Sequence, residues 1–256
     1  MVPDLFTGVL PAAGVGSRLR PLRCPKELLS IAFAPDPVTG VVQPMLAAEY
    51  SMRAMSDAGI RKCVMIISDR KSEMLRYFGN GTEAGLNIAY VNQPEPLGLA
   101  SAVDAAFHWV AESNVCLALP DTVFSPRTAL ATIKEELIRT RADLVLGVFP
   151  TADPQQLGPV RMGRDGRVTE VMEKPAVTDI FNTWGIAAWT PRFTALLHAR
   201  PAKLRKQSIS QVFNEAVKRK LNVRAVFFES GSYTDLGTGA SLAAMLFDSP
   251  TANAGG

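Results

Sequence analysis

The sequence predicts an α/β fold in which a mainly parallel central sheet is flanked by helices. Short runs of apolar and β-branched residues alternate along the chain with longer segments whose apolar residues recur at helical spacing. A glycine-rich stretch follows the first run directly, as in a strand-turn-helix unit. Strands and helices that alternate in this way form parallel sheets covered on both faces.

The first half of the chain contains most of these units. We expect strands at Phe6 to Leu10, Cys63 to Ile67, Ile88 to Val91, Val115 to Leu119 and Leu144 to Phe149. We expect helices at Met45 to Asp57, Ser72 to Phe78, Leu99 to Val110 and Arg127 to Arg139. The segment Phe33 to Val42 contains two prolines and a glycine, which predicts a surface loop.

The second half is richer in strands. The stretch VRMGRDGRVTEVME alternates around Arg164, Asp165 and Gly166, which predicts a hairpin. The elements expected after it are strands at Thr183 to Trp189 and Val223 to Phe228, and helices at Phe193 to Leu197, Gln211 to Lys220 and Ser241 to Phe247. No linker rich in glycine, serine or proline separates the halves, so we expect one domain at residues 1–248 and a flexible tail at 249–256.

Composition excludes several classes of protein. The 256 residues are 47% hydrophobic and 20% charged, which excludes disorder, and a formal net charge of +3 is too small for a nucleic-acid coat or a polybasic membrane anchor. Cys24, Cys63 and Cys116 lie too far apart for a zinc site or a disulfide framework. The sequence shows no basic leader and no run of about 18 apolar residues. We therefore expect a cytoplasmic protein with no nucleic-acid or membrane partner.

The stretch from Leu10 to Leu19, LPAAGVGSRL, predicts an anion-binding loop. It follows the first strand at its carboxyl end, where open α/β sheets bind ligands. Small residues let its backbone amides approach a phosphate, and Arg18 adds a fixed positive charge. The loop lacks the GxxxxGK[ST] sequence of a Walker A loop and the third glycine of a dinucleotide-binding loop. An ordinary turn between a strand and a helix is the alternative.

Extended to LPAAGVGSRLRPLRCPKELL, the loop resembles the signature of the sugar-1-phosphate nucleotidyltransferases, the family of glucose-1-phosphate thymidylyltransferase and UTP-glucose-1-phosphate uridylyltransferase. The resemblance extends from about residue 6 to about residue 245 and implies a Rossmann-like fold of the nucleotide-diphospho-sugar transferase type. It implies a nucleotide-binding part at about 1–150 and a smaller β-rich, sugar-binding subdomain at about 151–248. It also implies catalytic roles for Arg18 and Lys26, and nucleotide contacts by Leu10, Ala12, Ala13, Gly14, Gly16 and Ser17.

Two further pairs of residues follow in the order typical of the family. The segment QPEPLGLA is similar to the base-reading segment, which implies that Gln93 and Gly98 bind a pyrimidine, since an amide can both donate and accept. LPDTVF and YTDLGT resemble the metal-binding segments, which implies that Asp121 and Asp235 bind Mg²⁺. Taken alone, either aspartate is more often a helix cap or turn residue.

The sugar site is implied by motifs in the second half. Glu173 and Lys174 belong to an EKP sequence similar to that of the family, which implies a carboxylate on the sugar hydroxyls and a catalytic ammonium that bridges the sugar phosphate and the α-phosphate. A lone Glu-Lys pair is more often a solvated surface pair. The same resemblance implies sugar contacts by Gly158, Thr183 and Tyr233.

The resemblance implies a reaction in which an NTP and a sugar 1-phosphate give an NDP-sugar and pyrophosphate. A phosphate dianion is itself a nucleophile, so in-line attack on the α-phosphorus needs no Ser/His/Asp triad. Gln93 and Gly98 favour dTTP or UTP, and glucose 1-phosphate is the commonest sugar substrate of the family. Because relatives are often dimers or tetramers, a homo-oligomer is also implied.

Four positions depart from the pattern of the family. Gln43 stands where lysine is usual, Pro120 replaces a glycine, Tyr233 lies where tryptophan is common, and Trp184 is a further substitution. They motivate one alternative, a weakly active or inactive regulatory homologue that binds nucleotide sugars. A second alternative is a related transferase that acts on another phosphorylated alcohol, such as a cytidylyl- or guanylyltransferase. Retention of the full set of charged motif residues favours the enzyme.

Overall fold

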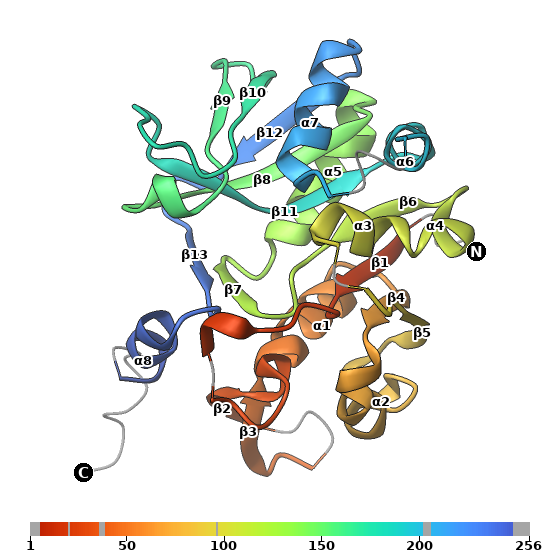
Figure 1. Ribbon diagram of the computed structural model, residues 1–256, viewed down its shortest axis with the longest axis vertical. Helices are drawn as coiled ribbons and strands as arrows, with labels where there is room; N and C mark the ends of the chain where they lie inside the picture. The colour runs from red at the N-terminus through yellow and green to blue at the C-terminus, as the bar shows by residue number, and fades with distance from the viewer. Residues whose placement is uncertain (1–5, 20, 36–38, 96, 202–205, 248–256) are drawn as a thin grey trace.

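The structure is a computed structural model that describes residues 6–19, 21–35, 39–95, 97–201 and 206–247. A seven-stranded sheet with the strand order β12-β8-β11-β6-β1-β4-β5 crosses the molecule (Figure 1). Every neighbouring pair in it is parallel except the two that involve β11, which runs antiparallel to both β6 and β8. The predicted α/β fold with a mainly parallel sheet is therefore confirmed.

The strands of the central sheet match the predicted runs closely. Their bounds are β1 (Phe6–Pro11), β4 (Lys62–Ile67), β5 (Asn87–Asn92), β6 (Asn114–Leu117), β8 (Leu144–Pro150), β11 (Asn182–Trp189) and β12 (Val223–Phe227). The helices are α1 (Ala47–Asp57), α2 (Ser72–Phe78), α3 (Leu99–Asp104), α4 (Phe107–Val110), α5 (Ala129–Thr140), α6 (Pro191–His198), α7 (Ile209–Lys218) and α8 (Gly239–Phe247).

Both faces of the sheet are buried. Successive side chains of a strand point to opposite faces, so Val9 and Leu10 of β1 enter two different cores. The core around Val9 is covered by α3, α6 and α7, and the core around Leu10 is covered by α1, α2 and α5. This sandwich holds the carboxyl ends of the parallel strands in fixed positions.

In the described part of the chain, three two-stranded sheets lie outside the central sheet. They pair β2 (Ser30–Pro35) with β3 (Val42–Leu46), β7 (Thr122–Ser125) with β13 (Ser232–Asp235), and β9 (Val160–Met162) with β10 (Val168–Val171). The β9–β10 pair is the predicted hairpin around Asp165, and it packs on α7, where Asn214 Oδ1 accepts from Val171 N at 2.8 Å. Strands from both halves of the chain thus share the central sheet, while this hairpin projects from it.

Two predictions about the first half are wrong. The surface loop expected at Phe33 to Val42 is in part a hairpin, because β2 extends to Pro35 and β3 begins at Val42. Residues 36–38 lie outside the described part of the chain. Pro35 and Pro44 are tolerated in these strands because a two-stranded ribbon has free edges that need no N–H from them. Met45 consequently belongs to β3, and the helix that follows begins at Ala47.

The helix expected from Leu99 to Val110 is broken into α3 and α4. Ala106 N donates to Val103 O at 3.1 Å and Trp109 N donates to Ala106 O at 2.9 Å, so the backbone tightens to three-residue spacing between the two pieces. Because the hydrophobic pattern continues across this turn, the break between the two helices cannot be predicted from the sequence. The predicted flexible tail at 249–256 lies outside the described residues.

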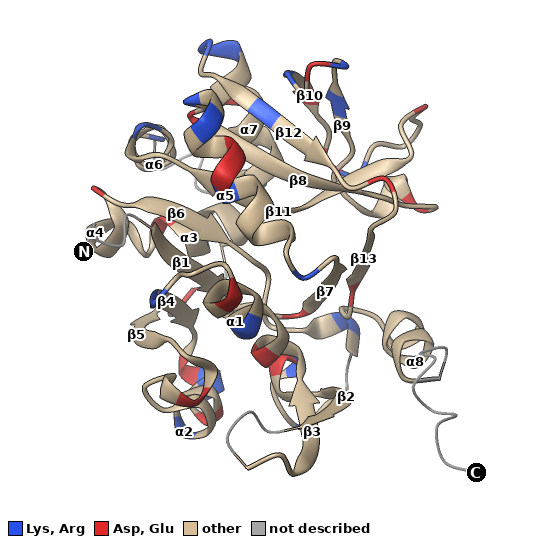
Figure 2. Ribbon diagram, turned by 180° about the vertical axis from the view of Figure 1, so that it is seen from behind, with Lys and Arg blue, Asp and Glu red and all other residues tan. Residues whose placement is uncertain are grey.

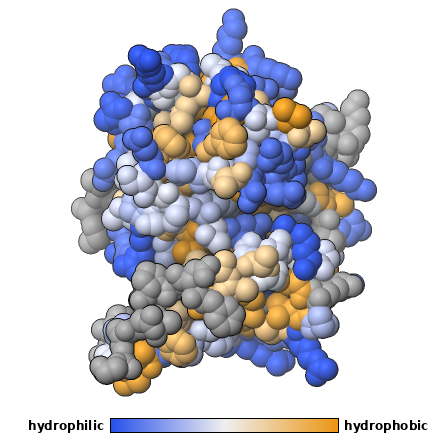
Figure 3. Space-filling view, turned by 90° about the vertical axis from the view of Figure 1, so that its left-hand side faces the viewer, coloured by the Kyte–Doolittle hydropathy of each residue, from blue (hydrophilic) through white to orange (hydrophobic). Residues whose placement is uncertain are grey.

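The surface carries charges of both signs and some exposed apolar residues. Figure 2 shows acidic and basic positions scattered over the ribbon. On the side that carries α8, apolar side chains gather in the lower half of the face (Figure 3). Among the described residues, Phe33 is 73% exposed, and Trp109 and Leu246 are exposed as well. No described helix has the length and apolar character that crossing a membrane requires.

Candidate active site

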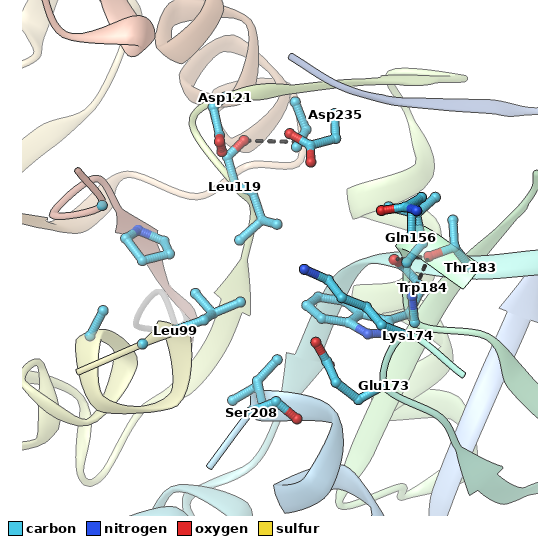
Figure 4. Close-up of a pocket in the computed structure, with 18 of the residues that line it drawn as sticks. Leu99, Leu119, Asp121, Gln156, Glu173, Lys174, Thr183, Trp184, Ser208 and Asp235 are labelled. Atoms are coloured by element: carbon cyan, nitrogen blue, oxygen red, sulfur yellow. Dashed lines mark hydrogen bonds between the residues drawn. The ribbon is translucent and has the colours of Figure 1, made fainter. Parts of the chain in front are cut away.

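A cavity of about 540 Å³ opens where the parallel strands β1 and β6 end. Residues from both halves of the chain line it (Figure 4). From the first half these are Pro11, Ala13, Gly14, Arg18, Lys26, Glu27, Gln93, Gly98, Leu99, Ala102, Leu119, Asp121 and Thr122. From the second half they are Gln156, Leu157, Gly158, Glu173, Lys174, Thr183, Trp184, Lys206, Gln207, Ser208, Ile209, Tyr233 and Asp235.

One end of the cavity presents an amide and backbone groups. Gln93 directly follows β5, and its side chain is only 7% exposed. Its Nε2 donates to Ser101 Oγ of α3 at 3.2 Å, which fixes the plane of the amide. Gly98 precedes α3 with a φ of +101°, a conformation that favours glycine. A held amide beside open backbone can make the paired hydrogen bonds that recognition of a base edge requires.

One side of the cavity holds two aspartates, one directly before β7 and one at the end of β13. Asp235 is the register partner of Thr122 in the β7–β13 pair, and Leu236 N donates to Asp121 O at 3.0 Å. Figure 4 shows Asp121 and Asp235 close together at one side of the cavity. The antiparallel pair therefore brings together two carboxylates that are far apart in the sequence.

Each aspartate has a cationic partner from the glycine loop or the turn after it. Lys26 Nζ forms a hydrogen-bonded ion pair with Asp121, and Arg18 lies 3.3 Å from Asp235. Burial by itself would lower the pKa of Lys26, but attraction by Asp121, Glu27 and Asp235 outweighs it, so that the pKa lies above its ordinary value. Lys26 is therefore a permanent cation in this site.

Gly16 supports Lys26 although it does not line the cavity. Its φ is +63°, and a Cβ at this position would lie 3.7 Å from Cδ of Lys26. The lysine stem therefore runs along the glycine loop on its way to Asp121. The absence of a side chain at Gly16 thus leaves room for the Lys26 stem beside the loop.

The opposite side of the cavity carries Glu173 and Lys174 (Figure 4). Lys174 has a φ of +44°, which is uncommon for a residue with a side chain, and its N–H donates to Leu157 O at 2.9 Å. Gly158 N donates to Thr183 Oγ1 at 3.3 Å, and Trp184 N donates to Gly158 O at 3.1 Å. These bonds join the connection after β8 to β11 and form a wall of polar groups.

Aromatic side chains form the rigid backing of this wall. Trp184 is buried edge-on against Phe213, and its Nε1 donates to Ser210 Oγ at 3.2 Å. Gly158 lies against the indole, and a Cβ there would also come within 3.3 Å of the Ser210 hydroxyl. Tyr233 stacks on Phe149, and burial raises the pKa of its hydroxyl well above the ordinary value. Tyr233 is therefore a neutral hydrogen-bonding group.

Most of the predicted site residues meet in this cavity. Those that line it are Arg18, Lys26, Lys174, Ala13, Gly14, Gln93, Gly98, Gly158, Glu173, Thr183, Tyr233, Asp121 and Asp235. Leu10 and Ala12 have buried side chains that face the core, and Ser17 lies in the 3₁₀ turn η1 (Ser17–Leu19). Ser17, Leu10 and Ala12 are not among the lining residues.

Sequence reasoning missed several lining residues. Glu27 and Trp184 stand inside recognised motifs, so their neighbours could have indicated them. Gln156 and the segment Lys206 to Ile209 at the start of α7 belong to no motif, and only the fold brings them to the cavity. Gln156, Lys206, Gln207 and Ser208 add further polar groups to the lining of the cavity.

The donor set of Asp121 and Asp235 fits a divalent cation of the Mg²⁺ type. Such ions use one or two carboxylates and complete their coordination with water and phosphate oxygens. Within the described residues, no group of three or more metal-ligating side chains surrounds a common point. The protein alone would thus supply only part of a coordination shell, as expected for an ion that arrives with a polyphosphate.

Known proteins share this sequence pattern and this fold. The family model described as nucleotidyl transferase matches residues 7–249. Glucose-1-phosphate thymidylyltransferases of Neisseria meningitidis and Streptomyces antibioticus are 29% and 31% identical over 66% and 64% of this chain. The aligned parts cover 55% and 43% of those proteins, so the match spans about half of the curated relatives.

Solved structures with low sequence identity have the same fold. A candidate glucose-1-phosphate thymidylyltransferase of Bacillus anthracis superposes with a TM-score of 0.82 at 20% identity, covering 94% of this chain and 93% of that one. UDP-glucose pyrophosphorylase of Acinetobacter baumannii gives 0.78 at 21% identity, covering 94% and 92%. The family that the motifs resemble is thereby confirmed, and the chain belongs to the nucleotidyl transferase family of sugar-1-phosphate nucleotidyltransferases.

Proposed function

We propose that this chain transfers a nucleotidyl group from an NTP to a sugar 1-phosphate and releases pyrophosphate. The observation that carries the proposal is the convergence of Arg18, Lys26, Lys174 and the aspartate pair on one cavity. A site for two phosphorylated substrates has to neutralise several negative charges and align them. These side chains supply three cations and two metal-binding carboxylates for that purpose.

The nucleotide is proposed to occupy the end of the cavity formed by the glycine loop and α3. There the Gln93 amide and the backbone at Gly98 would address a uracil or thymine, which needs one acceptor and one donor. Arg18 and Lys26 would hold the triphosphate and then the leaving pyrophosphate. On this basis dTTP and UTP are the favoured nucleotides.

The sugar 1-phosphate is proposed to occupy the opposite end. Glu173 would accept hydrogen bonds from sugar hydroxyls, and Thr183, Gly158 and Tyr233 would complete the contact. Lys174 would draw the sugar phosphate towards the α-phosphorus. An oxygen of the sugar phosphate attacks that phosphorus in line, the bond to the β-phosphate breaks, and its electron pair leaves with pyrophosphate. Glucose 1-phosphate is the sugar substrate we propose.

Asp121 and Asp235 would hold Mg²⁺. When bound there, the ion would neutralise phosphate oxygens and polarise the reacting group. In the structure, Lys26 and Arg18 form ion pairs with these carboxylates. Binding of a triphosphate would give both cations phosphate oxygens as new partners. The ion pairs therefore keep the charged groups ordered until substrates arrive.

Pyrophosphate release measured with each NTP, glucose 1-phosphate and Mg²⁺ tests the proposal. We expect release with dTTP or UTP that requires both the sugar phosphate and the metal ion. Release with CTP or GTP, but not with dTTP or UTP, would favour a related cytidylyl- or guanylyltransferase. Binding of nucleotide sugar without turnover, across a panel of sugar 1-phosphates, would favour the regulatory homologue.

Other expectations from the sequence stay predictions. They are the division into a nucleotide-binding part at about 1–150 and a sugar-binding part at about 151–248, the cytoplasmic location and the homo-oligomeric state. Size-exclusion chromatography with light scattering would test the last of these.

A further inference from the structure

A second ion pair is buried next to Lys26, at the edge of the cavity that Glu27 helps to line. Lys71 Nζ donates to Glu27 Oε1 at 2.6 Å, and the two residues are 6% and 1% exposed. Removing two charges from water costs so much that a buried pair is often no more stable than two apolar side chains in its place. Stability alone therefore does not explain why charges lie here.

Glu27 is the neighbour of Lys26 in the 3₁₀ turn η2 (Lys26–Leu28). Consecutive side chains of a 3₁₀ turn point about 120° apart. Lys26 accordingly reaches Asp121, while the Glu27 carboxylate turns to Lys71. Lys71 ends η3 (Asp69–Lys71), which follows β4. The pair thus ties the turn that carries Lys26 to the end of the strand next to β1.

The chain enters this turn from the surface. Residues 21–24 are exposed, and burial begins at Pro25 and the charged Glu27. On the far side of the turn, Ala47 N donates to Leu29 O at 3.0 Å and fixes the exit of the chain. The Glu27–Lys71 pair is therefore the deep polar contact that sets the entry to η2.

The two charges depend on each other. Burial raises the pKa of Glu27 and lowers the pKa of Lys71, and the attraction between them opposes both shifts. Glu27 Oε2 is buried without a hydrogen-bond partner among the described residues, so Lys71 is the main compensation for the carboxylate. Loss of either partner would leave a buried charge unpaired next to Lys26.

We propose that Glu27 and Lys71 are positioning residues whose ion pair holds the Lys26 turn in place for phosphate binding. The proposal rests on the proposed function, because it assigns Lys26 to the phosphates of the nucleotide. It separates two tasks: Lys26 exchanges Asp121 for a phosphate, and the pair behind it keeps the backbone still during that exchange. The sugar end of the cavity lies outside its influence.

The double variant Glu27→Gln, Lys71→Met tests the proposal. It removes both buried charges together, so no unpaired charge remains and the protein should fold. We expect its affinity for inorganic pyrophosphate with Mg²⁺, measured by calorimetry, to fall about tenfold. In the turnover assay, KM for the NTP should rise by a similar factor while KM for the sugar 1-phosphate stays within about twofold. Arg70→Met is the matched control, because it removes an exposed cation next to Lys71.

The outcomes separate the two proposals. Pyrophosphate affinity equal to that of the unmodified protein and of Arg70→Met would overturn the positioning role, as would equal increases in both KM values. Pyrophosphate binding that weakens in the double variant supports the role even if no NTP is turned over. Lack of turnover by the unmodified protein under all conditions would instead contradict the proposed function.

Discussion

Asp235 faces Thr122 across the β7–β13 pair, which places its carboxylate beside that of Asp121. The two aspartates come from segments more than a hundred residues apart, and each ends or follows a strand. A ribbon of two short strands is thus what assembles the proposed metal site. In the structure, Asp235 pairs with Arg18 of the glycine loop, and Asp121 pairs with Lys26 of the turn after it.

Asp121→Asn should lower turnover by roughly 10² to 10³, because removal of one charge-stabilising group at such a site costs about 2.7 to 4 kcal/mol. The amide has nearly the same shape, so the fold should stay intact. Initial rates of pyrophosphate release against Mg²⁺ concentration measure the effect. Asp179→Asn is the control, since that exposed carboxylate pairs with Arg161 at 3.0 Å outside the cavity. Near-full turnover in Asp121→Asn would refute the metal assignment.

Lys174→Gly should separate stability from activity. The residue has a φ of +44°, a conformation that destabilises a residue with a side chain by about 1 kcal/mol relative to glycine. We expect the free energy of unfolding in urea to rise by about 1 kcal/mol or stay level, while turnover falls roughly 10². Lys220→Gly, at a residue with a φ of +60° that does not line the cavity, should gain stability and keep its activity. Equal turnover in both variants would contradict the role of Lys174.

Gly158→Ala should disturb the sugar end of the cavity. A Cβ there would overlap the Trp184 indole, and such overpacking costs about 1 to 3 kcal/mol. Thermal unfolding and KM for the sugar 1-phosphate measure the two effects, and both should worsen. In the double variant Gly158→Ala, Trp184→Phe, the smaller ring lacks the indole edge that the new Cβ would overlap, so part of the stability should be recovered. Gly239→Ala, which meets nothing within 4 Å, is the control.

Lys71→Met should destabilise the fold by about 3 kcal/mol, since it leaves Glu27 buried without its cation. Burial then raises the pKa of Glu27 further, so the folded protein binds a proton more tightly than the unfolded chain. When the pKa of a carboxyl group is higher in the folded protein than in the unfolded chain, the free energy of unfolding falls as the pH rises from the unfolded pKa to the folded pKa. The deficit relative to the unmodified protein should therefore be larger at pH 8 than at pH 5 in urea titrations. A deficit that does not change with pH would contradict this assignment.

The sequence predicts the central sheet well because its strands are buried runs of β-branched and apolar residues. Val64 and Val145, for example, lie within such runs, and both are in the core. The β7 and β13 strands were not predicted, because Thr122 and Ser232 follow no hydrophobic pattern. Their pairing depends on contacts between distant segments, which single-sequence periodicity does not contain.

Only the site residues that lie within a recognisable motif could be predicted from the sequence. Lys26 and Asp121 stand in recognisable strings, and the fold brings them into contact. Lys71 stands in no motif, and its role is visible only once the chain has folded and placed it 44 positions from Glu27 in sequence but in contact with it. Buried charge pairs of this kind cannot be inferred from composition, because an isolated lysine is far more often exposed.

The antiparallel strand β11 has a consequence for how the chain can be divided. It fills the space between β6 and β8 and supplies hydrogen bonds to both. A fragment that ends near residue 150 would leave β6 and β8 with open edges, which recruit strands from other molecules. We therefore expect cooperative unfolding of the chain in one transition, and aggregation of separately expressed halves until they are refolded together.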